Sequence, residues 1–235
     1  FKHVENSDIK KCDEIEKFIE KYEWLGTMPN RIVHRFVCEY CNVIAGVVIL
    51  SFPNSYSNFL GESDKNIEVL ISRGACVSWS PKNLGSSLIM FAIRWCVKNT
   101  TYRIFSAYSD KEAKELGTIY QACNFFYLGD NFGSSKLYFD MSNPKKGWFN
   151  NRTFSKLSTM KRLIKKHNII WEKNWNIKTT ILWNNIPENV IILLNDEVKK
   201  FKNECLNRNT TTKHKYVYIL GRNKIETKIL KKKFL

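Results

Sequence analysis

One stretch, residues 68–130, constrains the fold more than any other part of the chain. Its apolar residues change spacing in a way that predicts strand, turn, helix, strand, loop, helix and strand in that order. The run Val69–Ile71 predicts a buried strand, residues 84–95 predict a helix with one apolar face, and residues 103–108 predict a second strand. Strand, crossover helix and strand form one βαβ unit, whose two strands are expected to lie parallel.

The turn between the first strand and its helix, residues 80–87, is the first place where we expect chemistry. A turn of small residues that leads into a helix presents free backbone N–H groups and the positive end of the helix dipole, which suits phosphate. The spacings of a P-loop and of a dinucleotide-binding loop are both absent. Two interpretations stay open: a phosphate-binding turn, or an ordinary connection in which Ser80 or Asn83 caps the helix.

The remaining residues predict an α+β protein with a mixed sheet. Residues 7–22 predict an amphipathic helix capped by Ser7 or Asp8, and residues 32–40 and 43–52 predict two antiparallel strands with a turn close to Cys41-Asn42. Later helices and strands are expected over 116–124, 125–128, 135–141, 155–167, 187–208 and 213–221. The polar segment 54–64 predicts a loop of the kind that often borders a site.

Positive charge is distributed unevenly along the chain. Residues 1–140 carry 16 Lys+Arg and 16 Asp+Glu, whereas residues 141–235 carry 22 and 6, so the whole net charge of +16 lies in the second part. Such an excess predicts a polyanionic partner. A solvated basic surface is the alternative. A membrane partner is not expected, because no basic helix with Trp and Leu on one face dominates the region.

The clearest boundary in the chain is residues 143–147, where proline and glycine coincide with the change in charge. It predicts a division between residues 1–142 and a basic region over residues 143–235, which packs on them and holds the polyanionic partner. The expected phosphate contacts are Arg152, Lys161, Arg162, Lys165 and Lys166. Aromatic residues between them, such as Trp148, suit base stacking, although aromatic residues in such regions more often belong to a core.

The seven cysteines are scattered among predicted strands and helices, which indicates reduced thiols in a cytoplasmic protein. Cys38 and Cys41 form a C-x-x-C pair without a second half, so two unrelated thiols are expected in preference to a zinc site. The sequence has no apolar run long enough for a membrane-spanning helix, and its first residues are too charged for a secretory signal.

The order of predicted elements resembles the GNAT acyltransferase fold. Within it, YSD at 108–110, GTIYQACNF at 117–125 and YLG at 127–129 resemble the phage Mom DNA-modification family, whose run has the form SYxD…GxIYQAxNWxYxG. The chain departs from that run at Ala107 and Phe125. The likeness is specific in this run, looser over the first 140 residues and faint in the tail.

This resemblance implies a transferase with a GNAT-like catalytic core over residues 1–142, whose basic region holds double-stranded DNA. The enzyme would add a small acyl-derived, carbamoylmethyl-like group to the exocyclic amine of adenine, which protects phage DNA from restriction in the bacterial host. The resemblance implies a small-molecule donor, either acetyl-CoA or another acyl or aminoacyl donor, and it implies Fe(II). The modified base, the donor, the recognition sequence and the oligomeric state stay open.

The resemblance also implies a set of site residues. Asp110 and Tyr120 match an acid and a tyrosine that are functional in the family and are proposed to help bind iron; taken without the family, they suit a helix cap and a core aromatic. The family's histidine ligand has no counterpart, but Glu23 stands near its position, and a carboxylate suits Fe(II) as imidazole does. The expected donor-binding residues are Arg73, Asn83, Gly85, Ser86 and Ser87.

Two other functions stay open. A GNAT-type N-acetyltransferase would act on a protein, a small amine or an already modified base. A non-catalytic DNA-binding anti-restriction protein would keep the scaffold without its chemistry, and the missing histidine favours that alternative.

Overall fold

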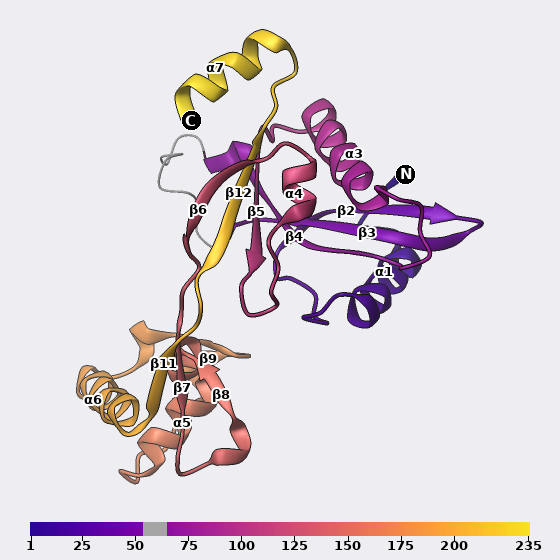
Figure 1. The fold of residues 1–235 in the computed structure, drawn as a ribbon. Coiled ribbons are helices and arrows are strands. Elements are labelled where there is room, and N and C mark those ends of the chain that lie inside the picture. Colours follow the sequence, from indigo (N-terminus) through magenta and orange to yellow (C-terminus); the bar gives the residue numbers. More distant parts are fainter. Residues whose placement is uncertain (54–64) are drawn as a thin grey trace. The chain divides into compact units, whose positions relative to one another are not determined.

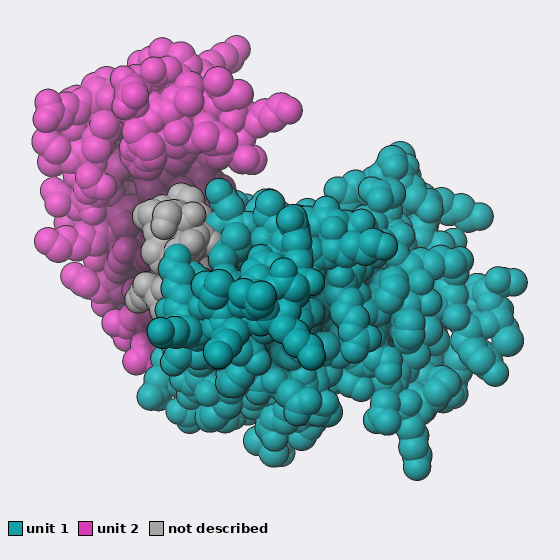
Figure 2. Space-filling view, turned by 90° about the horizontal axis from the view of Figure 1, so that it is seen from above, with its two compact units in different colours: residues 1–132, 212–235 teal, residues 133–211 magenta. Residues whose placement is uncertain are grey.

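The chain folds as two units in the computed structural model, which describes residues 1–53 and 65–235 (Figure 1). Unit 1 comprises Phe1–Phe132 and Thr212–Leu235, and unit 2 comprises Gly133–Thr211 (Figure 2). The predicted loop over 54–64 lies outside the described residues. Each unit has its own hydrophobic cluster, so each is described by itself.

A seven-stranded mixed sheet forms the centre of unit 1, in the order β1-β2-β3-β4-β5-β12-β6. The strands are β1 Lys2–Val4, β2 Ile32–Tyr40, β3 Val43–Ser51, β4 Glu68–Cys76, β5 Ile104–Asp110, β6 Phe126–Phe132 and β12 Lys213–Ile219. Only β4 and β5 run parallel; the other neighbouring strands of this sheet are antiparallel. The predicted βαβ unit and the predicted mixed α+β class are confirmed.

Helices cover both faces of this sheet. They are α1 Ile9–Tyr22, α3 Leu84–Asn99, α4 Thr118–Ala122 and α7 Lys224–Phe234, with a short 3-10 turn η1 at Lys65–Ile67. Figure 1 shows α1 and α3 on opposite sides of β2 and β3. The predicted cap of α1 is confirmed, because the Asp8 carboxylate accepts the Lys11 N–H at 3.1 Å. In the described ranges, none of the helices combines the length and the apolar character that crossing a membrane requires.

The hairpin of β2 and β3 follows directly from its turn sequence. Cys41 and Asn42 have φ of 48° and 63°, the positive values that a two-residue type I′ turn requires at both positions. Cys38 is buried in the core while Cys41 is exposed in the turn. The prediction of two unrelated thiols is confirmed, and all seven cysteines are free.

The C-terminal residues depart from the predicted division of the chain. Strand β12 does not belong to a separate basic region; it inserts between β5 and β6 in the sheet of unit 1. Unit 2 carries 15 Lys+Arg and 6 Asp+Glu, a net charge of +9, and residues 212–235 carry 8 and 1, a net charge of +7. The excess of positive charge is therefore shared between both units.

Unit 2 is a small three-stranded sheet packed on helices. Its sheet has the order β11-β7-β8, with β7 Lys136–Phe139, β8 Trp148–Asn150 and β11 Leu206–Asn209. Its helices are α5 Leu157–Lys165 and α6 Glu188–Glu204, which confirm the two predicted helices. Short elements complete it: η2 Pro144–Lys146, η3 Asn151–Ser155, η4 Lys173–Trp175, β9 Asn176–Ile177, β10 Thr180–Ile181 and η5 Trp183–Asn185. Aromatic side chains dominate its core, among them Phe149, Phe154, Trp175 and Phe201.

A pair of histidines in unit 1 makes stability depend on pH. His3 Nε2 and His34 Nδ1 lie 3.2 Å apart, and the His3 ring stacks on Trp95 with 3.8 Å between centroids. Burial of the His34 ring is the main cause that lowers its pKa to about 4, and the neighbouring His3 is a smaller one. Burial also lowers the pKa of His3, against the opposing effect of Glu5.

We therefore expect the free energy of unfolding to fall as pH decreases from about 6.5, where the unfolded chain begins to take up the proton that folded His34 does not bind. The loss between pH 7.5 and pH 5 should be about 2 kcal/mol for His34. Urea unfolding at both pH values measures it. His34→Phe keeps a ring beside Trp95 and should show a smaller loss; an equal loss in both proteins would contradict the assignment.

Candidate functional site

The two parallel strands of unit 1 separate before either of them ends. β4 pairs with β5 only over residues 68–71 and 104–107, yet β4 continues along β3 to Cys76 and β5 continues along β12 to Asp110. We call the opening between residues 72–76 and 108–110 the strand fork. Backbone groups that face each other across it require partners. Ligands of open α/β sheets bind at such carboxyl ends of parallel strands.

The start of α3 lies at the end of the turn that follows β4. Asn83 occupies the cap position with φ of 64°, and its side chain makes no capping bond, so the predicted cap by Asn83 is wrong. The first N–H groups of a helix have no partner within the helix, but the Leu84 N–H of α3 donates to the Pro81 carbonyl at 3.2 Å. The N–H groups that follow Leu84 in the first turn are therefore the ones that suit an anion. Four of the predicted donor residues, Asn83, Gly85, Ser86 and Ser87, are brought together here.

Gly85 lies where α4 approaches the first turn of α3 closely. A Cβ atom at this position would lie 2.8 Å from Ile119 Cδ1 of α4 and 3.5 Å from Cys76 Sγ. The Cys123 thiol, just after α4, donates to the Ser86 carbonyl at 3.6 Å. The short helix that carries Tyr120 is therefore fixed directly against the first turn of α3.

Arg73 and Glu23 meet on the β4 side of the fork. The Glu23 carboxylate accepts the N–H groups of Leu25 and Gly26 at 3.0 and 3.1 Å, and its side chain is only 9% exposed. Arg73 Nε lies 3.8 Å from Glu23 Oε2 and donates to the Thr27 carbonyl at 2.8 Å. Arg73 thus holds the loop after α1 and orients Glu23. The sequence predicted a place for Arg73 beside the donor-binding turn, but it did not predict this contact with Glu23.

Tyr120 lies on α4 with its ring 5.4 Å from those of Phe125 and Tyr216. Burial raises the pKa of its hydroxyl, and the carboxylates of Glu115 and Glu23 raise it further. The hydroxyl is therefore neutral at physiological pH. Glu23, almost a hundred residues earlier in the chain, makes a smaller contribution to this shift in pKa than burial and Glu115 do.

Asp110 ends β5 in an ion pair. Its Oδ2 lies 2.6 Å from Lys213 Nζ of β12, and its Oδ1 accepts the Glu112 N–H at 2.9 Å. Its own N–H donates to the Glu115 carboxylate at 3.1 Å. Sequence analysis missed Lys213 and Glu115. Glu115 could have been found, because it is an acidic residue between the motifs that contain Asp110 and Tyr120. Lys213 could not, because it lies about a hundred residues from Asp110 in the sequence.

The predicted iron site does not fit these residues. In the part of the chain that the structure describes, no group of three or more His, Cys, Asp or Glu side chains is placed to hold a metal ion. The Asp110 carboxylate pairs with Lys213, and the Glu23 carboxylate accepts two backbone N–H groups.

The predicted phosphate contacts of unit 2 gather around one helix. Lys161, Arg162 and Lys165 lie on α5, Lys166 caps it, and Arg152 lies in η3. All five are exposed, because the buried face of α5 is formed by residues such as Leu163 and Ile164. Arg162 is partly engaged: its Nη1 lies 3.9 Å from Asp140 Oδ2, and its guanidinium lies 4.5 Å from the centre of the Phe201 ring.

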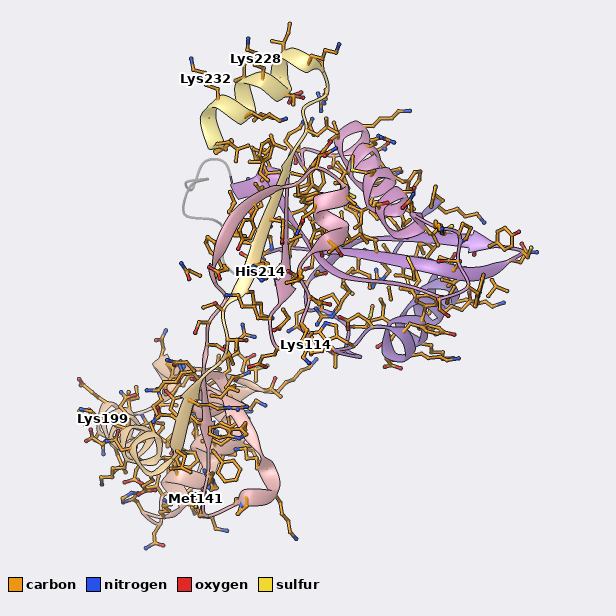
Figure 3. The ribbon with its side chains drawn as sticks, in the orientation of Figure 1. Lys114, Met141, Lys199, His214, Lys228 and Lys232 are labelled. Atoms are coloured by element: carbon orange, nitrogen blue, oxygen red, sulfur yellow. The ribbon has the colours of Figure 1, made fainter. Side chains whose placement is uncertain are left out.

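Unit 1 has basic residues of its own on α7. Lys228 and Lys232 lie one turn apart, and Figure 3 shows both on the side of α7 away from the sheet. Leu230 and Phe234 on the other side pack on Ile104 and Ile219 of the sheet. The exposed face of α7 is thus a second basic surface.

Taken together, the strand fork and the start of α3 define an α+β protein whose parallel strands open at their carboxyl ends. A sequence model described as the Mom protein family matches residues 7–184. That match covers more than half of the chain, and the chain belongs to the Mom protein family. No curated protein shows significant similarity to it.

Solved structures with a similar arrangement include GNAT-type acetyltransferases. A Bacillus subtilis acetyltransferase in complex with CoA is 12% identical over 93% of this chain and 97% of its own, with a TM-score of 0.40. A GNAT family acetyltransferase from Elizabethkingia anophelis with acetyl-CoA bound is 12% identical over 80% and 76%, with a TM-score of 0.36. An N-acetyltransferase from Staphylococcus aureus is 19% identical over 45% of this chain and 56% of its own, with a TM-score of 0.33. Likeness at this level supports no statement about activity.

Proposed function

We propose that this protein is a transferase that places a small acyl-derived group of the carbamoylmethyl type on the exocyclic amine of adenine in DNA. The observation that carries the proposal is the strand fork, where two open strand edges lie near a helix start without a side-chain cap. Tyr120 is carried by α4, whose Ile119 lies against the same helix start. Membership of the Mom protein family supports the choice of DNA as the acceptor.

The donor is expected to lie along the fork. An extended donor arm with amide groups would pair with the open backbone edges of β4 and β5, and donor phosphates would accept N–H groups from the first turn of α3. Acetyl-CoA has both features, and an aminoacyl donor is the alternative. Gly85 keeps the first turn of α3 free of a side chain.

The groups around the fork suit acid–base catalysis of acyl transfer. The acceptor nitrogen forms a bond to the acyl carbon, and the bond from that carbon to its leaving group breaks. Acetyl-CoA would leave an N-acetyl group and release its thiolate. A glycyl-type aminoacyl donor would leave a group with the same atoms as carbamoylmethyl. The Glu23 carboxylate takes the proton that the nitrogen loses, and the Tyr120 hydroxyl gives a proton to the departing thiolate. Asp110, paired with Lys213, holds the loop that leads to Tyr120.

The basic surfaces are proposed to hold the DNA while the target base enters this site. A base inside a duplex cannot reach a buried group, so the target adenine must leave the stack. Contacts to the phosphates on either side provide the affinity that such a step requires. The residues around α5 are the proposed source of those contacts.

Incubation of the purified protein with duplex DNA and acyl-labelled acetyl-CoA tests the proposal. We expect label in a deoxyadenosine derivative after digestion to nucleosides. If the label appears only in added amines or proteins, the acceptor is one of those molecules and not DNA. An absence of label, together with an absence of acetyl-CoA binding in calorimetry, would contradict the CoA donor and direct the test to aminoacyl donors.

The phosphate contacts predict a specific salt dependence. Lys165→Ala and Lys166→Ala should each lower the slope of log K against log salt by about one unit, because each lost contact releases one fewer counterion. Asp110→Ala should leave the slope unchanged, since it removes no positive charge. Lys17→Ala, which removes an exposed lysine of α1, is the matched control and should also leave the slope unchanged. Unchanged slopes in both α5 variants would show that DNA is held elsewhere.

A further inference from the structure

The small sheet of unit 2 covers a core with one face and leaves large side chains exposed on the other. Tyr138 of β7 and its neighbour Phe149 of β8 pack in the hydrophobic cluster with Phe154. Because side chains alternate along a strand, Leu137 and Phe139 lie on the opposite face. Neither of them belongs to that cluster.

Cross-strand pairing identifies the other residues of this outer face. Phe139 lies opposite Trp148 on one side and Leu206 on the other, and Leu137 lies opposite Asn150 and Arg208. Directly opposed residues share a face. The outer face, which we call the aromatic platform, therefore consists of Leu137, Phe139, Trp148, Asn150, Leu206 and Arg208.

The rings of the platform form an ordered and open surface. The centroids of Phe139 and Trp148 are 5.4 Å apart, and the guanidinium of Arg208 lies 4.7 Å above the Trp148 ring. Trp148 is 41% exposed and Leu206 is 53% exposed. Met141, which follows β7 and is labelled in Figure 3, adds a further side chain that is 59% exposed. Indole, phenyl and guanidinium planes are the groups on which nucleobases stack.

Size and charge decide which partner suits this platform. Three strands of four, three and four residues span on the order of 200 Å² at ordinary strand spacings. A stable protein–protein interface needs about 800 Å² from each partner, so the platform is too small for one, whereas it accommodates one or two nucleobases. The unit that carries it has a net charge of +9, which complements a phosphate chain.

We infer that the platform binds unstacked nucleobases of single-stranded DNA, with Trp148 and Phe139 as stacking surfaces. This inference rests on the proposed function, since it assigns a place to bases that leave the duplex when the target adenine is exposed. Phosphates of the same strand are neutralised by basic residues of the unit, among them Arg208 and Arg152.

Binding of the full chain to two single-stranded oligonucleotides tests the platform. One is a run of thymidines, and the other has the same length and charge but abasic sites. Trp148→Leu removes the ring and keeps an apolar side chain, so it should weaken binding of the thymidine strand about 5- to 150-fold. It should leave binding of the abasic strand unchanged. Trp148→Phe retains a ring and should bind the thymidine strand within about threefold of the unaltered protein.

Two further variants secure the interpretation. Trp183 is 40% exposed in the same unit but lies outside the sheet, so Trp183→Leu should change neither affinity. Arg208→Gln removes the guanidinium from the Trp148 ring without removing a ring, and should weaken both strands through its charge. Thermal unfolding confirms that each variant is folded.

The platform would be refuted if Trp148→Leu bound the thymidine strand as the unaltered protein does, or weakened both strands equally. It would also be refuted if the unaltered protein bound neither strand, or if sedimentation showed a dimer that Trp148→Leu dissociates. Failure of the proposed function is a separate result, namely binding that depends on Trp148 without formation of any modified nucleoside.

Discussion

Replacing Tyr120 by phenylalanine is expected to slow product formation by about 100-fold or more, the range usual for loss of a general acid. Burial, followed in size by the Glu115 carboxylate, raises the pKa of Tyr120, so its hydroxyl stays protonated until it reacts. The ring contacts with Phe125 and Tyr216 do not need the hydroxyl, so the fold should be retained. Single-turnover rates at saturating donor and DNA measure the effect on the chemical step.

Tyr127→Phe is the matched control for this experiment. Tyr127 lies 5.3 Å from the Tyr216 ring on the side of β6, is 53% exposed, and bonds His214 through its hydroxyl at 3.0 Å. Loss of that hydroxyl should leave the rate within about twofold, because no reacting group is beside it. Donor and DNA affinities should be unchanged in both variants. If Tyr120→Phe reacted at a rate close to that of the unaltered protein, Tyr120 would serve only in packing and not as the general acid.

Gly117→Ala is expected to have the largest effect on stability. Gly117 begins α4 with φ of 64°, and a Cβ atom there would lie 2.6 Å from Cζ of the Tyr216 ring. Tyr216 cannot move away freely, since it is buried and its hydroxyl donates to the Leu116 carbonyl at 2.7 Å. Left-handed strain of about 1 kcal/mol and overpacking of about 2 kcal/mol together predict a loss of about 3 kcal/mol.

Gly26→Ala separates the two causes. Gly26 has φ of 58°, similar to that of Gly117, but the nearest atom to its added Cβ would be the Glu20 carbonyl oxygen at 3.4 Å. Only backbone strain remains, so the expected loss is about 1 kcal/mol. Denaturant unfolding of both variants measures the difference. Equal losses would show that Tyr216 yields to the new side chain and does not fix the start of α4.

Elements that depend on neighbouring residues could be predicted from the sequence, and those that depend on distant ones could not. The β2–β3 hairpin was predicted with its turn because Cys41 and Asn42 form the turn by themselves. The parallel pair β4 and β5 followed from one crossover helix. The insertion of β12 beside β5 joins residues about a hundred positions apart, and no local pattern encodes such a pairing. The predicted division of the chain differed from the observed one for this reason.

The same distinction applies to the candidate site. The motif residues Asp110 and Tyr120 were found through the resemblance, and Glu23 was found through its place after the first helix. Their partners became visible only in three dimensions: Lys213 arrives on β12, and Arg73 reaches Glu23 from β4. Those partners change the chemistry, because an Asp110 paired with lysine and a Glu23 that already accepts two backbone N–H groups are poor metal ligands.

The measurement that tests the central claim most directly is the mass of the nucleosides in DNA from cells that express the protein. It requires no assumption about the donor. We predict a new deoxyadenosine derivative heavier by a carbamoylmethyl-type group, which is absent when Tyr120→Phe is expressed at the same level. DNA that contains only the ordinary nucleosides, from cells in which the folded protein is abundant, would contradict the account.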